Sequence, residues 1–161
     1  MSATGQPHGH PGRQHRPHPP GTLRWAAADP LRAVLAAIAV ITVVSGAAQV
    51  PFGGPILQLL GAEPTPDARQ LFGTVGMFMV VVGGLLLQTL LSASPSTDVV
   101  FWSGLQKLGA FGAVGTGVLN SVFSPLALAV AVFDLTTAVL LYLYWRRLTR
   151  VEDAARPGGA A

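Results

Sequence analysis

The chain has 161 residues, of which half are apolar and only 11% are charged; the net charge is +3 and the mean hydropathy is +0.51. A soluble domain carries about 25% charged residues, so this composition predicts a surface that faces lipid. The lack of cysteine excludes disulfides, CxxC redox chemistry, thiolate zinc sites and Cys-ligated iron–sulfur clusters, and the few basic residues near the two ends do not form a nucleic-acid footprint.

Residues 1–30 form a His/Pro-rich segment with six prolines and little apolar surface. Such a segment cannot bury enough surface to offset its ordering entropy, so we predict a disordered cytoplasmic tail. All four histidines lie in it, and a fixed metal site would need ligand geometry that this composition does not provide. Because no histidine lies in an apolar segment, the sequence argues against a b-type cytochrome, in which a pair of membrane histidines holds the haem. We therefore predict no metal and no cofactor.

Four apolar segments follow, at about residues 31–50, 71–91, 99–123 and 126–145. Each is close to the roughly 20 residues that cross a ~30 Å hydrocarbon core. The second contains no charge, whereas Lys107 interrupts the third and Asp134 the fourth. We therefore predict a transmembrane domain over residues 31–147, followed by a short cytoplasmic tail at 148–161.

The links between these segments predict how the helices are arranged. Proline and glycine in residues 51–70 end the first helix and delay the second, and residues 55–61 are expected to lie flat at the interface. The links at 92–98 and at Ser124–Pro125 are short, which makes successive helices antiparallel neighbours. The predicted fold is an all-α integral membrane protein, an antiparallel four-helix transmembrane bundle.

Basic residues flank the first and last segments, whereas the first loop contains Arg69 alone. By the positive-inside rule, this places both termini in the cytoplasm of a multi-pass plasma-membrane protein. The flanking residues are Arg13, Arg16, Arg24, Arg32, Arg146, Arg147 and Arg150. In an alternative interpretation, the first segment is a secretory signal cleaved near Ala48, leaving three spans. The thirty-residue start and the span-length apolar stretch argue against cleavage.

Lys107, the only lysine in the chain, and Asp134 are the candidate functional residues. Each costs about 2.5 to 3.5 kcal/mol at the centre of a membrane helix, so such groups usually face a partner. Counted from the cytoplasmic ends, they lie about 12 and 16 Å deep; counted from the Ser124 turn, about 25 and 15 Å. Three interpretations stay open: an ion pair that fixes helix register, a Lys107 that snorkels to the headgroups, and a charged pair that moves protons or ions.

Small residues that recur on one face of a helix, at strict four-residue spacing on the third segment, predict close helix packing. On the third segment they are Gly109, Ala113 and Gly117; on the fourth, Ala127, Ala131 and Ala138; and the second has Gly73, Gly76 and Gly83 in a similar pattern. The same stripes would serve packing within the chain or formation of a homo-oligomer. Gln88, Thr116 and Asn120 are expected to form hydrogen bonds between helices.

No GxSxG, HExxH or P-loop motif is present. The four short spans, the Pro-rich first loop, the segment WSGLQKLG at 102–109 and FDL at 133–135 resemble small four-helix bacterial membrane proteins of the DoxX-like kind and neighbouring uncharacterised families. The resemblance covers about residues 31–147. It implies a link to quinone-linked sulfur oxidation or redox-stress complexes, although a thiol-dependent version does not fit a chain without cysteine.

These observations leave three functions open. The leading hypothesis is a non-enzymatic accessory or scaffolding subunit in the lipid bilayer, with a homo-oligomeric or other membrane-protein partner. The first alternative is a small transporter or channel that uses Lys107 and Asp134. The second alternative is a quinone-associated oxidoreductase subunit.

Overall fold

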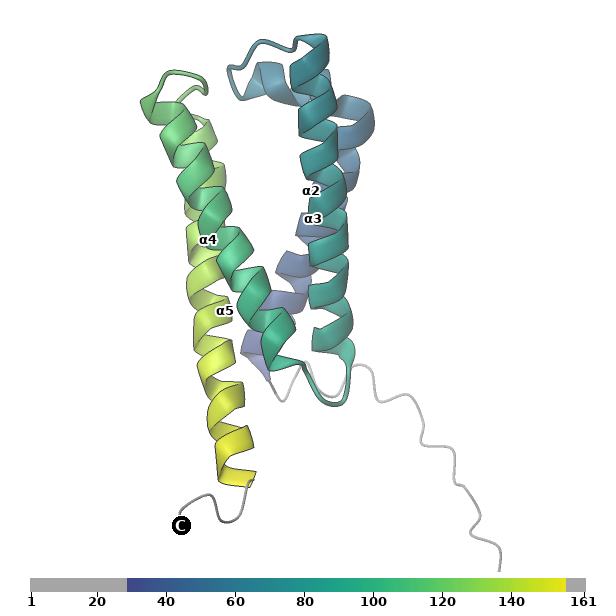
Figure 1. The fold of residues 1–161 in the computed structure, drawn as a ribbon, viewed down its shortest axis with the longest axis vertical. Helices are drawn as coiled ribbons and strands as arrows, with labels where there is room; N and C mark the ends of the chain where they lie inside the picture. The colour runs from purple at the N-terminus through teal and green to yellow at the C-terminus, as the bar shows by residue number, and fades with distance from the viewer. Residues whose placement is uncertain (1–28, 156–161) are drawn as a thin grey trace, which may run out of the picture.

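A computed structural model of the chain describes residues 29–155, which form four α-helices and no strands (Figure 1). The helices are α2 (Pro30–Leu59), α3 (Pro66–Leu91), α4 (Thr97–Leu119) and α5 (Ala127–Ala155). The prediction of an all-helical fold with four helices is therefore confirmed. The tail predicted at residues 1–30 lies almost entirely outside the described residues, as do the last six residues of the chain.

Three of the helices, α2, α3 and α5, are long and apolar enough to cross a membrane. Among the described helices, α4 is the exception, since Gln106, Lys107 and several glycines lower its hydropathy. Large apolar side chains are exposed on all four helices, for example Val44 at 61%, Phe78 at 60% and Trp102 at 64%. A surface of this kind is typical of helices that contact lipid rather than water.

Short polar residues and prolines determine where the first three helices begin. The side chains of Asp29, Thr65 and Ser96 each accept a hydrogen bond from a backbone N–H three residues later, at 3.2 to 3.4 Å. Proline follows two of these caps, as Pro30 and Pro66, where its missing N–H costs nothing.

The first helix does not end at Val50, as the sequence predicts, but continues to Leu59. Pro51 and Pro55 lie inside it, and the backbone departs from helical geometry at Phe52, with φ −111° and ψ 20°. Each proline removes one hydrogen bond from the helix and clashes with the preceding turn, so the two kink the helix instead of ending it. The last turns of α2 lie at an angle to the rest of the helix (Figure 1).

The boundaries of the last two helices also differ from the prediction. The third helix ends at Leu119 rather than Phe123, because the chain turns at Asn120 and Ser121 adopts a positive φ of 59°. The last helix continues ten residues beyond the predicted end at Trp145, to Ala155. Residues 146–155 are rich in charge, so only the apolar part of this helix was visible as a predicted span.

The helices pack as two pairs, α2 with α3 and α4 with α5. The pairs approach each other where the described chain begins and ends, and they diverge toward the opposite end (Figure 1). The core lies at the first of these ends and draws on all four helices. Its fully or nearly fully buried residues are Leu35, Ala36, Ala39, Leu86, Leu90, Val100, Leu141 and Tyr144. At the opposite end, where the helix pairs are farther apart, one hydrogen bond joins the linkers 60–65 and 120–126. The Ser124 N–H donates to the Leu60 carbonyl at 2.8 Å.

Candidate functional site: a buried ion pair between α4 and α5

The structure brings the two charged candidates together. The Lys107 Nζ lies 2.7 Å from Asp134 Oδ1, and the two side chains are only 7% and 8% exposed. Lys107 lies near the middle of α4, and Asp134 lies two turns into α5. The ammonium is therefore held inside a helix pair, a position that does not fit the interpretation in which Lys107 snorkels to the headgroups.

The helix ends bring the two groups closer in depth than the sequence predicts. The sequence alone leaves a gap of about 10 Å between them when depth is counted from the Ser124 turn. Counted from the helix ends at Leu119 and Ala127, Lys107 lies about 18 Å deep and Asp134 about 10.5 Å, so the gap narrows to about 7.5 Å. The flexible stem of the lysine spans the remainder.

The residues around the pair come from both helices. The Lys107 Nζ lies 5.4 Å from the centre of the Phe133 ring, close enough for a cation–π interaction. Ser103, one turn before Lys107, is 3% exposed, and Thr137, one turn after Phe133, is fully buried. Thr137 Oγ1 donates to the Phe133 carbonyl at 2.8 Å, which satisfies its own hydroxyl. In a setting of low dielectric, removal of either charge leaves the other without compensation.

The predicted stripe of alanines on α5 forms the packing face toward α4. Ala127 is 1% exposed, Ala131 0% and Ala138 8%, and Asp134 lies on the same face at helical spacing. Small side chains here let the α4 backbone approach, as Gly104 does: a Cβ at that position would lie 3.4 Å from Leu141 Cβ. The face that buries Asp134 is thus the one that the small residues indicate.

The predicted stripe on α4 does not pack against another described helix. Gly109 and Ala113 are exposed, a Cβ at Gly109 would meet nothing within 4 Å, and a Cβ at Gly117 would meet the ring of Phe123 in the following turn. The face of α4 that is buried contains Val100, Ser103 and Lys107 instead. Lys107 indicates the buried face of α4 better than the small residues do, because a charge inside an apolar helix usually faces a partner.

The three polar residues expected to bond between helices do not do so. Thr116 Oγ1 donates to the Gly112 carbonyl of its own helix at 2.7 Å. Asn120 caps α4 through its backbone N–H, which donates to the Thr116 carbonyl at 3.0 Å. Gln88 is exposed and forms no hydrogen bond with a described side chain. Next to Gln88, Thr89 makes a polar contact between α3 and the start of α4. Its Oγ1 accepts a hydrogen bond from the Ser96 N–H at 2.7 Å.

A second polar cluster, which no sequence pattern predicts, lies at the end of the molecule where all four helices meet. Arg32 Nε donates to the Leu90 carbonyl at 2.6 Å, and the same guanidinium donates to the Ser92 carbonyl. Asp29 accepts from Arg147 at 3.1 Å, which connects the start of α2 to α5. On the sequence, Arg32 and Arg147 count only as charges that set orientation.

Two buried polar atoms of α2 have no hydrogen-bond partner among the described residues, Thr42 Oγ1 and Gln49 Oε1. The other end of the Gln49 amide contacts Met79 Sδ at 3.2 Å, so this side chain lies against α3. No three His, Asp or Glu side chains gather as potential metal ligands between residues 29 and 155.

The comparisons with known proteins add no relative: no family model, no curated protein and no solved structure matches this chain. The fold and the site define an all-helical protein with three helices apolar enough to cross a membrane. Its most distinctive chemical feature is one ion pair buried between two of its helices.

Proposed function

We propose that the chain is a non-enzymatic accessory or scaffolding subunit of the plasma membrane, with four antiparallel spans and both termini in the cytoplasm. The closed Lys107–Asp134 pair is the observation that carries this proposal. In it, the pair acts as a register device that holds α4 against α5, and the exposed apolar faces contact lipid and a partner membrane protein.

Contacts at the two ends support the antiparallel arrangement. Asp29 and Arg32 at the start of α2 contact Arg147 of α5 and the carbonyls at the end of α3. The opposite linkers meet through Ser124 and Leu60. Successive helices therefore run between the same two ends in alternating directions, and with the basic residues placed inside, residues 60–65 and 120–126 lie outside.

The four-span topology requires that α4, which is less apolar than the other three helices, also crosses the membrane. Its 23 residues extend about 34 Å, enough for a ~30 Å core. Its most costly residue for insertion is Lys107, and the Asp134 carboxylate at 2.7 Å compensates that charge. We therefore infer that α4 inserts together with α5, as a hairpin.

A structural role for the pair fits its surroundings better than transport does. Neither Lys107 nor Asp134 lines the apolar groove between α4 and α5 or the hollow between Pro51 and Arg69, and the two charged atoms are in direct contact. Buried ion pairs that hold a specific packing arrangement are known, whereas a transported ion would need a polar path beside the pair. The resemblance to DoxX-like proteins is consistent with an accessory membrane subunit.

A neutralisation cycle tests the structural role. Lys107→Met and Asp134→Leu are each expected to lower the free energy of unfolding by about 3 to 5 kcal/mol, because each leaves a buried charge unpaired. The double variant is expected to recover most of this loss. Unfolding is measured by circular dichroism in mixed detergent micelles.

The same variants test the function. A stoichiometric membrane-protein partner is expected to co-purify in mild detergent with the parent chain and with the double variant alike. The proposal is wrong if the double variant is folded but loses its partner, or if the parent chain in proteoliposomes conducts protons and the folded double variant does not.

A further inference from the structure

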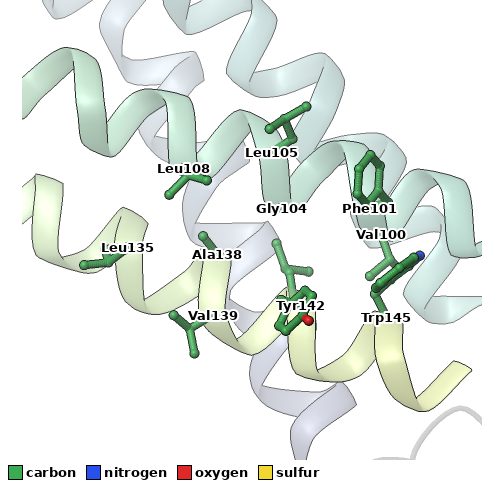
Figure 2. A pocket seen from close by; sticks show the side chains of 11 residues that line it. Val100, Phe101, Gly104, Leu105, Leu108, Leu135, Ala138, Val139, Tyr142 and Trp145 are labelled. Atoms are coloured by element: carbon green, nitrogen blue, oxygen red, sulfur yellow. The ribbon is translucent and has the colours of Figure 1, made fainter.

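An apolar groove of 260 Å³ runs along the surface between α4 and α5, and neither Lys107 nor Asp134 lines it. Gly104 and Ala138 line it between the two helices, where the lack of a side chain on Gly104 and the single methyl group of Ala138 leave space. Leu105, Leu108 and Val139 form its walls, and each is about half exposed. Figure 2 shows these side chains projecting from both helices around the groove.

The groove is elongated along the helices. On α5 it extends from Leu135 to Trp145, ten residues or about 15 Å. Leu108 and Leu135 lie at one end, and Phe101, Tyr142 and Trp145 gather at the other (Figure 2). In the proposed topology this long axis is close to the membrane normal, which is also the direction of lipid acyl chains.

The aromatic end of the groove is the end near the proposed cytoplasmic interface. Tyr142 stacks on Trp145 with ring centres 6.0 Å apart, and Phe101 lies 5.5 Å from Trp145. Tyrosine and tryptophan are enriched at the level of lipid headgroups. The groove is thus closed by apolar leucines at its deep end and by amphipathic rings at its shallow end.

A positive charge lies directly beside the aromatic end. The Arg146 guanidinium is 5.8 Å from the centre of the Tyr142 ring, and the side chain is exposed. The neighbouring Arg147 is engaged with Asp29 on another side of α5. Arg150, one turn further along α5, is also exposed, as are the acidic residues Asp98, Glu152 and Asp153 at this end. Arg146 is the basic residue that contacts the aromatic rings of the groove. A guanidinium at this position matches one phosphate group.

From this arrangement we infer that the groove binds one glycerophospholipid, with an acyl chain along Gly104 and Ala138 and its phosphate on Arg146. The inference rests on the proposed membrane insertion and adds a specific lipid site to it. The phosphate is the recognised group, so phosphatidylglycerol and phosphatidylethanolamine bind alike, and the same lipid without a phosphate binds more weakly.

Quenching of Trp145 fluorescence by brominated lipids tests the site. The full chain carries three tryptophans, and Trp25→Phe with Trp102→Phe leaves Trp145 alone. In maltoside micelles, dibromo-phosphatidylglycerol is expected to quench Trp145 saturably, at one lipid per chain. Dibromo-diacylglycerol is expected to bind about fivefold more weakly, the contribution of one basic residue near a membrane surface.

Matched variants separate the groove from general lipid contact. Val139→Phe fills the groove and is expected to abolish saturable quenching, whereas Val132→Phe, seven residues earlier on the same face of α5 and outside the groove, is expected to keep it. Arg146→Gln is expected to abolish the preference for the phosphate. Arg69→Gln, which removes an equal charge near the start of α3, is expected to leave the preference unchanged.

Three results would overturn the site. Quenching that rises linearly and equally with both lipids means that the chain is embedded but has no site. Saturable quenching that survives Val139→Phe means that the lipid lies elsewhere. A Trp145 that is shielded from lipid in a cross-linked dimer means that a second copy covers the groove. If the chain is instead recovered in the soluble fraction without detergent, membrane insertion itself is wrong.

Discussion

At the scale of single residues, Arg32 connects the first described helix to the end of the second. Its guanidinium donates to the carbonyls of Leu90 and Ser92, at the C-terminal end of α3. The last carbonyls of a helix have no partner within the helix, and a positive charge is favourable there. By contrast, Arg147 forms an ion pair with Asp29 through a side chain that is 58% exposed.

These two arginines are expected to differ in their effect on stability. Arg32→Gln should lower the free energy of unfolding by about 2 kcal/mol, because hydrogen bonds from a charged group contribute about 1.5 to 3 kcal/mol. Arg147→Gln should cost less than about 1 kcal/mol, as exposed ion pairs do. Chemical denaturation in mixed micelles measures both. Equal losses of unfolding free energy in the two variants would show that the hydrogen bonds of Arg32 to the end of α3 contribute no more than an exposed ion pair.

The identity of the charged candidates could be predicted from the sequence, but not their contact. A lone lysine and an aspartate in apolar segments are conspicuous, and the cost of burying a charge predicts that each seeks a partner. Whether Lys107 and Asp134 lie at one depth depended on where α4 ends, and the positive φ at Ser121 is not encoded by a glycine or asparagine. The carbonyl contacts of Arg32 depend on tertiary packing and had no sequence pattern.

At the scale of helices, the contact between α2 and α3 depends on glycines that face each other. A Cβ on Gly76 would lie 2.5 Å from the Gly46 carbonyl oxygen and 2.7 Å from Gln49 Cβ. No real side chain fits at that distance, so the two backbones would have to separate. Close backbone approach brings many van der Waals contacts, which are the main source of helix association in lipid.

Gly76→Ala is therefore expected to destabilise the protein by about 1 to 3 kcal/mol, as overpacking does. Gly84→Ala on the same helix is the control, because a Cβ there would meet nothing within 4 Å. The control should be neutral or slightly stabilising, since alanine favours a helix over glycine. The two variants are compared by thermal unfolding in the same detergent. A Gly76→Ala chain as stable as the control would show that the helices do not cross at this position.

Small-residue stripes identified two of the three packing faces from sequence. They did so on α3 and α5, where Gly76 and Ala131 are buried, but not on α4, where Gly109 is exposed. A glycine stripe indicates only that close approach is possible, and it does not say whether a neighbour is present. Likewise, Pro51 predicts a disturbed backbone, but whether a proline ends or kinks a helix depends on the packing beyond it.

At the scale of the whole molecule, the helices form two pairs that meet around a core at one end. The sequence predicts that each helix packs to a similar extent against the next one in the chain, because short links bring successive helices together. The link at 92–96 is as short as the other two but connects helices that share few contacts, because α2 contacts α3 and α4 contacts α5 far more extensively. Link length therefore predicted the order of the helices but not which pairs would form the main contacts.

The central claim, that the chain crosses a membrane four times with both ends inside, is tested by labelling single cysteines. The natural chain has none, so Glu63→Cys, Ala93→Cys and Val122→Cys each introduce one thiol at an exposed position in a linker. With a membrane-impermeant maleimide, we expect Glu63→Cys and Val122→Cys to be labelled in intact cells, and Ala93→Cys only after permeabilisation. Labelling of Ala93→Cys in intact cells, failure of Val122→Cys to react there, or recovery of the chain in the soluble fraction would contradict the account.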